Sequence, residues 1–271
     1  MGSAVAVRRI WVDDGVSLPV AECGPESGPC VLLVHGMGDS WRSYAPVLEH
    51  MPDDLRVVVP SLRGHGDADR PDQGYTPTGF VSDLVAVLDD LGVEQAVIGG
   101  HSSGALVAQL FAIVHPGRCL GIVLVGAPRM MRGNPDAAAL DAMFATLEDP
   151  VDADFVRGFT EKLFAGTPPP EFLDMQVAET LKVPARVIRA TWAGLRAFDI
   201  SSELGHIGVP TLIIWGDHDH LALSSRQVQD DLLQAIPDAD LHVYQGVGHS
   251  PHWERPARLA ADVASFVHQV V

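Results

Sequence analysis

The segment Gly100-His101-Ser102-Ser103-Gly104 places a serine in the pattern Gly-x-Ser-x-Gly. It lies between an apolar run that predicts a strand (Ala96–Ile98) and one that predicts a helix (Ala105–Val114). A residue at such a junction occupies a strained tight turn, and side chains at the two glycine positions would collide with the neighbouring strand and helix. The turn presents the hydroxyl to a cleft at a helix N-terminus, which stabilises negative charge. We therefore predict that Ser102 is a nucleophile.

A serine hydroxyl needs a general base, and the base needs an acid that orients it. Downstream of Ser102, Asp217 and Asp219 follow the strand pattern Thr211–Trp215, and His249 lies in a glycine-rich loop before the last helix. The carboxyl ends of parallel strands meet at one edge of a sheet, where open α/β sheets place their sites. The sequence thus predicts His249 as the base. Spacing leaves Asp217 and Asp219 open as its partner.

The negative charge that develops on an attacked carbonyl oxygen needs hydrogen-bond donors. The segment His35-Gly36-Met37-Gly38 follows the apolar run Cys30–Val34, and its glycines permit a close backbone approach. We predict that the backbone N–H groups of Met37 and Ser103 form the oxyanion hole.

Apolar runs and helical patterns alternate along most of the chain, which is typical of an α/β fold with a mostly parallel sheet and helices on both faces. Eight strands are predicted: Arg9–Asp13, Ser17–Cys23, Cys30–Val34, Arg56–Val59, Ala96–Ile98, Gly121–Val125, Thr211–Trp215 and Asp240–Tyr244. Helices are expected at residues 40–50, at 80–91, at 105–114, at 224–236 and at the C-terminus.

The alternation stops between residues 129 and 208, where helical patches are separated by Pro- and Gly-rich joins. The expected helices are Ala137–Leu147, Ala153–Phe164 and Glu171–Leu181. Methionine and aromatic residues are concentrated there, which indicates a lid over an apolar pocket. The residues predicted to bind substrate are His101, Trp41, Met130, Phe144, Phe159 and Trp192.

Composition narrows the classes of function. The 271 residues include 18 Lys and Arg against 35 Asp and Glu, a formal net charge of −17, so phosphate backbones and anionic lipids are disfavoured partners. The uncharged stretch Gln95–Gly117 is centred on Gly, His and Ser, which argues against a membrane helix. The N-terminus has no secretory signal, and three cysteines without metal-type spacing suggest reduced thiols. We expect a cytoplasmic monomer or homodimer that binds neither nucleic acid nor membrane.

Neither a metal nor another cofactor is expected. Asp217, His218, Asp219 and His220 are adjacent, and neighbouring side chains of an extended segment point in opposite directions, so they cannot converge with His249 and His252 on one ion. The stretch Arg63–Asp69 lacks the Gly-Lys-Ser/Thr ending of a phosphate-binding loop.

Five motifs together resemble those of the α/β-hydrolase fold family, in the family's order. They are His35-Gly-Met-Gly38, Arg63-Gly-His-Gly66, Gly100-His-Ser-Ser-Gly104, Gly216-Asp-His-Asp219 and Gly248-His-Ser-Pro-His-Trp-Glu-Arg-Pro256. The resemblance is to the branch with a helical cap after the sixth strand, which implies a core of residues 1–128 and 209–271 and a cap of residues 129–208. It also implies that Asp219 is the acid. The alternative place for the acid, at the end of the sixth strand, is occupied by Gly126-Ala127-Pro128.

This resemblance implies a serine hydrolase that acts on a small or medium, largely apolar ester or lactone. Dehalogenases and epoxide hydrolases of the fold use an aspartate nucleophile, whereas this chain has Ser102. Carbon–carbon bond hydrolases often carry Trp after the catalytic histidine, where this chain has Ser250. Carbon–carbon cleavage, perhydrolysis, acyl transfer and a ligand-sensing role remain alternatives on the same triad.

Overall fold

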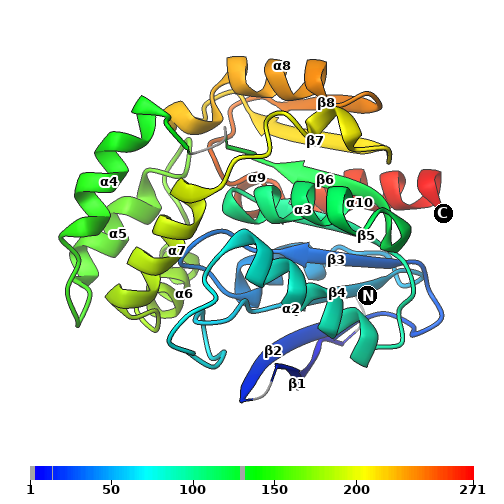
Figure 1. The fold of residues 1–271 in the computed structure, drawn as a ribbon, viewed down its shortest axis with the longest axis horizontal. Helices are drawn as coiled ribbons and strands as arrows, with labels where there is room; N and C mark the ends of the chain where they lie inside the picture. Colours follow the sequence, from blue (N-terminus) through cyan, green and yellow to red (C-terminus); the bar gives the residue numbers. More distant parts are fainter. Residues whose placement is uncertain (1–3, 14, 129–131) are drawn as a thin grey trace.

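The computed structural model describes residues 4–13, 15–128 and 132–271, and its eight strands form one sheet. The strands are β1 (Ala6–Asp13), β2 (Val16–Cys23), β3 (Cys30–Val34), β4 (Arg56–Pro60), β5 (Ala96–His101), β6 (Cys119–Val125), β7 (Thr211–Gly216) and β8 (Ala239–Tyr244). Their order is β1-β2-β4-β3-β5-β6-β7-β8 (Figure 1). Only the pairs β1–β2 and β2–β4 are antiparallel. The predicted eight-stranded, mostly parallel sheet is therefore confirmed.

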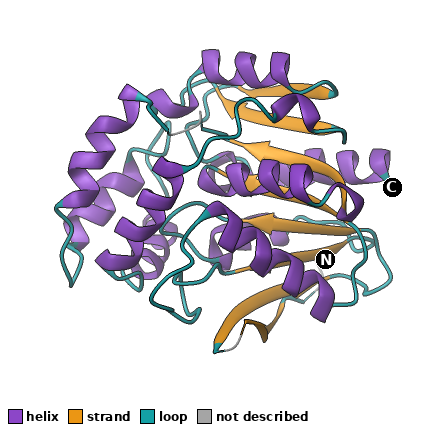
Figure 2. Ribbon diagram, viewed as in Figure 1, coloured by secondary structure: helices purple, strands orange, loops and turns teal. Residues whose placement is uncertain are grey.

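Helices cover both faces of the sheet, because successive side chains of a strand point to opposite faces (Figure 2). On β3, Leu32 and Val34 belong to one core cluster, with residues from α2 (Pro77–Asp90), α3 (Ser103–Val114) and α8 (Arg226–Ala235). Val31 and Leu33 belong to the opposite cluster, with residues from α1 (Ala45–Leu48) and α10 (Pro256–Val270). This two-sided burial explains why the central strands are continuous apolar runs.

Between β6 and β7 the described part of the chain contains helices and no strand. These helices are α4 (Ala138–Ala145), α5 (Ala153–Glu161), α6 (Pro170–Thr180) and α7 (Ala185–Ala197), with short 3₁₀ turns at Pro135–Ala137 and Leu204–His206. Figure 1 shows α4–α7 grouped beyond the ends of the parallel strands, on the side to which their arrows point. Helices α4–α7 thus lie next to the edge of the sheet that carries the predicted catalytic loops.

Two helical predictions differ from the structure. Helix α7 was not predicted, although Ile188, Trp192 and Leu195 are buried at helical spacing. The helix predicted at 40–50 is instead a 3₁₀ turn, Trp41–Tyr44, followed by the four-residue α1. Pro46, which lacks an N–H group, lies at the start of α1, where a proline fits a new helix better than the interior of a longer one.

The predicted motif Arg63-Gly-His-Gly66 has a structural role in this fold. Arg63 donates two hydrogen bonds to Asp83 of α2, at 2.7 and 2.5 Å, and both side chains are buried. Gly64 and Gly66 have φ values of +81° and +51°, which favour glycine. The turn after β4 is therefore anchored to α2.

None of the described helices combines the length and the apolar character that crossing a membrane requires. Cys23, Cys30 and Cys119 are free thiols in buried positions.

Candidate active site

Ser102 occupies the turn between β5 and α3 with φ +51° and ψ −119°, and it is the one non-glycine residue with a positive φ in the described ranges. A Cβ on Gly100 would collide with the backbone of Gly104, and a Cβ on Gly104 would lie 2.5 Å from the carbonyl oxygen of Val34. The two glycines therefore allow the strained turn and the close packing of α3 on β3. A strained turn of this kind is a frequent sign of a functional site.

Asp219 and His249 form a buried pair. The Nδ1 atom of His249 lies 2.8 Å from Oδ2 of Asp219, and the two side chains are 3% and 0% exposed. Because a carboxylate only accepts, Nδ1 carries the proton and Nε2 keeps a free lone pair. Asp217 is exposed instead and accepts a hydrogen bond from the backbone N–H of Gly246 at 2.6 Å. Of the two candidate acids, Asp219 is the one that contacts the histidine.

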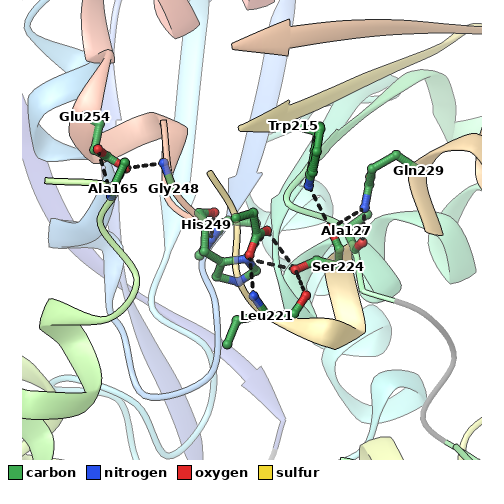
Figure 3. A network of polar contacts seen from close by, with 11 residues as sticks. Ala127, Ala165, Trp215, Leu221, Ser224, Gln229, Gly248, His249 and Glu254 are labelled. Carbon is green, nitrogen blue, oxygen red and sulfur yellow. Dashed lines mark hydrogen bonds and ion pairs between the residues drawn. The ribbon is translucent and has the colours of Figure 1, made fainter. Parts of the chain in front are cut away.

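Ser224 is a third member of this network that the sequence did not predict. Its hydroxyl donates to Oδ2 of Asp219 at 2.7 Å and lies 3.2 Å from Nδ1 of His249. Its carbonyl oxygen accepts hydrogen bonds from Trp215 Nε1 and Gln229 Nε2, at 2.7 and 3.1 Å, so its backbone is held in place (Figure 3). No local pattern marks this serine, because the contacts come from loops that meet only in the folded chain.

Ser102 and His249 both line one cavity, together with Met37 and Ser103. Within the described ranges the Ser102 hydroxyl makes no hydrogen bond to His249. Catalytic hydrogen bonds are commonly long in ligand-free enzymes and shorten when substrate binds. The predicted nucleophile and base therefore face the same cavity.

The loop with the predicted oxyanion donor is positioned by His35. Its Nε2 accepts from the N–H of Leu62 at 3.0 Å, so its Nδ1 carries the proton and donates to the carbonyl of Gly36 at 2.8 Å. These two bonds hold the start of the loop in front of β5. In the part of the chain that the structure describes, neither the backbone N–H of Met37 nor that of Ser103 donates to another backbone group.

The cavity has a mostly apolar wall. Of the residues predicted to bind substrate, His101, Phe144, Phe159 and Trp192 line it. A second cavity shares Met37, Asp39, Phe144, Phe159 and Leu163 with the first, so the two adjoin.

Of the two other residues predicted to bind substrate, Trp41 does not lie at these cavities. It lines neither of them, because it packs beside the core cluster on the sheet face that α1 and α10 cover. The Arg42 guanidinium lies 4.8 Å from the centre of the Trp41 ring. The sequence-based prediction for Trp41 therefore finds no support. Met130 lies outside the described residues.

Glu254 connects the loop that carries His249 to the helical segment between β6 and β7. Its carboxylate accepts the N–H of Gly248 at 2.6 Å and the N–H of Ala165, from this segment, at 3.1 Å (Figure 3). The N–H of His249 in turn donates to the carbonyl of Leu163 at 2.9 Å. A Cβ on Gly248 would lie 2.6 Å from Leu163 O, so this contact requires glycine. The histidine loop and the helical segment are thus held together.

Buried histidines make the protein sensitive to acid. Burial, with the nearby His65, lowers the pKa of His35 to about 3, and burial lowers the pKa of His65 to about 4. An unfolded histidine titrates near 6.5, so below that pH the unfolded chain binds more protons than the folded one and the free energy of unfolding falls. For the two residues we expect a loss of about 2–3 kcal/mol between pH 6 and pH 5, measured by urea unfolding.

The His65→Gln variant should lose the share of this pH dependence that His65 contributes, about 1 kcal/mol between pH 6 and pH 5, whereas His50→Gln, at an exposed position, should keep all of it. An equal pH dependence in wild type and His65→Gln would contradict the assignment.

The fold and the candidate site together are typical of one class of protein, the α/β hydrolases. A model of the family described as "Alpha/beta hydrolase family" matches residues 31–262, so the chain belongs to this family. Over 94% of its length it is 28% identical to "Epoxide hydrolase 3" of Siraitia grosvenorii, of which it covers 96%.

Two solved structures are also similar. The esterase RhEst1 from Rhodococcus sp. ECU1013 is 27% identical, with a TM-score of 0.85 over 98% of this chain and 99% of that chain. The enol-lactonase from Burkholderia xenovorans LB400 is 22% identical, with a TM-score of 0.83 over 96% of this chain and 100% of that one. The likeness to the esterase accords with a hydrolase activity, and the likeness to the enol-lactonase shows that the two proteins share a fold.

Proposed function

We propose that the protein is a serine hydrolase that cleaves a small or medium, largely apolar carboxylic ester or lactone. The observation that carries the proposal is the buried Asp219–His249 pair beside a cavity that Ser102 also lines. The apolar wall of that cavity favours an uncharged substrate. Residues 129–208 act as the cap over this cavity, on a core of residues 1–128 and 209–271.

In the proposed mechanism, Ser102 Oγ attacks the carbonyl carbon while Nε2 of His249 takes its proton. Asp219 keeps the proton on Nδ1 and stabilises the imidazolium. The N–H groups of Met37 and Ser103 bind the oxyanion. His249 then gives the proton to the leaving alcohol. A water molecule, deprotonated by His249, attacks the acyl-enzyme, and His249 gives this proton to Ser102 Oγ as the bond to the acyl group breaks and the acid is released. The reaction needs no metal or other cofactor.

The name of the epoxide-hydrolase relative does not extend to this chain. Epoxide opening in this fold needs a carboxylate nucleophile that forms an alkyl-enzyme ester, and Ser102 stands in that position. The likeness to an esterase at 27% identity supports ester cleavage instead.

A panel of p-nitrophenyl esters of graded acyl length, together with lactones, tests the proposal, with mass spectrometry after treatment with a fluorophosphonate. We expect turnover of at least one ester or lactone and one phosphonyl adduct on Ser102. A folded protein with no turnover on the panel and no adduct would overturn the proposal.

The size of the substrate should depend on Phe159, which lies at the boundary between the two cavities. Phe159→Ala joins them and removes apolar contacts from short acyl chains. We expect the ratio of kcat/KM for an octanoyl ester to that for a butyryl ester to rise about 10-fold or more. A matched control is Phe172→Ala, because Phe172 is a cap residue that packs on Phe164 and Trp253 and lines neither cavity. Equal selectivity in wild type and Phe159→Ala would exclude this acyl pocket.

A further inference from the structure

Three buried side chains that the proposed reaction does not use converge beside the catalytic loop. Asp39 follows β3, His101 ends β5 and His252 lies in α9 (Pro251–Glu254). One possible ligand atom of each lies within 4.8 Å of those of the other two, and all three residues are buried. Two imidazoles and one carboxylate are a ligand set that zinc and similar transition metals prefer.

The hydrogen bonds show which nitrogen of His101 is free. Its Nε2 lies 3.1 Å from the carbonyl oxygen of His249, and a carbonyl accepts, so Nε2 carries the proton. The Nδ1 atom is then an unprotonated acceptor, and it is buried without a hydrogen-bond partner.

His252 is in the same situation. Ser43 Oγ accepts from Trp253 Nε1 at 3.0 Å and donates its single proton to Oδ2 of Asp39 at 3.1 Å. Ser43 Oγ also lies 3.0 Å from Nε2 of His252. Because the hydroxyl has no second proton, the histidine must be the donor in this hydrogen bond. The Nδ1 atom of His252 is left with a lone pair and, like that of His101, it is buried and unpartnered. A buried polar atom without a partner costs about 1–3 kcal/mol, and two in one cluster call for an occupant.

Asp39 lacks a compensating cation. Among the described residues it forms no ion pair with Lys or Arg, and its buried carboxyl accepts a hydrogen bond from Ser43. Gly36 leaves room next to it, because a Cβ there would lie 3.0 Å from Nδ1 of His101 and 3.5 Å from Oδ2 of Asp39. Both Asp39 and His101 line the cavity that Ser102 and His249 also line, so the cluster borders the proposed active site.

We propose that Asp39, His101 and His252 form a binding site for a divalent transition metal ion of the zinc type. Bonds of about 2.0–2.1 Å would draw the ligand atoms to about 3.4 Å from one another, a small inward movement of the side chains. The ion connects the loop after β3, the end of β5 and α9, three segments that surround Ser102. Its role is to stabilise this framework, and it takes no part in the acyl transfer.

Metal content gives the first test. Chelator-treated protein is incubated with Zn²⁺, desalted and analysed for metal, and we expect one zinc ion per chain. Free zinc at 100 times its Kd should raise Tm by roughly 5 °C. Asp39→Asn, which keeps the size of the side chain, and His252→Asn should each weaken binding at least about 100-fold, since loss of an outer partner alone costs 10–100-fold.

The control is the double variant His218→Gln/His220→Gln, which removes an exposed histidine pair near the catalytic acid and should keep full zinc binding. If either cluster variant fails to fold, X-ray absorption of zinc-loaded wild type decides, with two imidazoles and a carboxylate expected around the ion. Failure of wild type to retain zinc, zinc bound by Asp39→Asn as tightly as by wild type, or a shell with fewer than two imidazoles would each overturn the proposal. None of these readouts depends on esterase activity.

Discussion

Replacing Ser102 with alanine is expected to lower kcat on the best ester substrate by about 10⁵–10⁶-fold, with little change in substrate binding. The reason is chemical, because Ser102 is the one described non-glycine residue with a positive φ, at the turn between β5 and α3, whereas the neighbouring Ser103 already belongs to α3. The cavity keeps its wall, so loss of the hydroxyl removes the acyl-enzyme pathway and leaves ground-state contacts intact. Single-turnover kinetics with a p-nitrophenyl ester measures the effect, and substrate titration of the variant measures binding.

Ser82→Ala is the matched control, because Ser82 is an exposed serine of α2 whose hydroxyl donates only to the carbonyl of Thr78. It should retain wild-type kcat and the fluorophosphonate adduct. A Ser102→Ala variant that still turns over ester at more than about 1% of the wild-type rate, or still acquires the adduct, would show that another residue is the nucleophile.

The second large effect concerns the choice between two aspartates. Asp219→Asn should lower kcat by about 10⁴-fold, because an amide can donate to Nδ1 of His249 and so favours the tautomer with the proton on Nε2. Asp217→Asn should change kcat by less than about 3-fold, because Asp217 is exposed and accepts a backbone N–H from Gly246, a bond that an asparagine oxygen can also accept.

Both rates should be measured across pH 6–9 with the same ester, and both variants should show an unchanged Tm to within a few degrees. Both variants replace an aspartate with asparagine, at positions two residues apart. The ratio of their kcat values therefore reports the effect of position alone. A larger loss in Asp217→Asn than in Asp219→Asn would be incompatible with the proposed acid.

Much of the fold could be predicted from the sequence, because its signals are local. The central strands, such as Cys30–Val34, are apolar on both faces and bounded by turn residues, and all eight predicted strands lie within observed ones. The turn at Ser102 could also be predicted, because its two glycines are required by steric contacts with nearby residues and with the adjacent strand. In the cap, the unpredicted α7 shows that short amphipathic patches are weaker signals.

Tertiary structure alone decided which side chains meet. Three backbone hydrogen bonds, donated by residues 217, 218 and 219 to Tyr244, Val247 and Gly216, curl the loop so that Asp219 faces His249 and Asp217 faces solvent. The contacts of Ser224, the position of Trp41 away from the cavities, and the cluster of Asp39, His101 and His252 also arise between segments distant in the chain. Sequence thus determined where strained turns and apolar strands form, since these depend on neighbouring residues. The direction of each loop side chain depends on packing among distant segments, which no local pattern encodes.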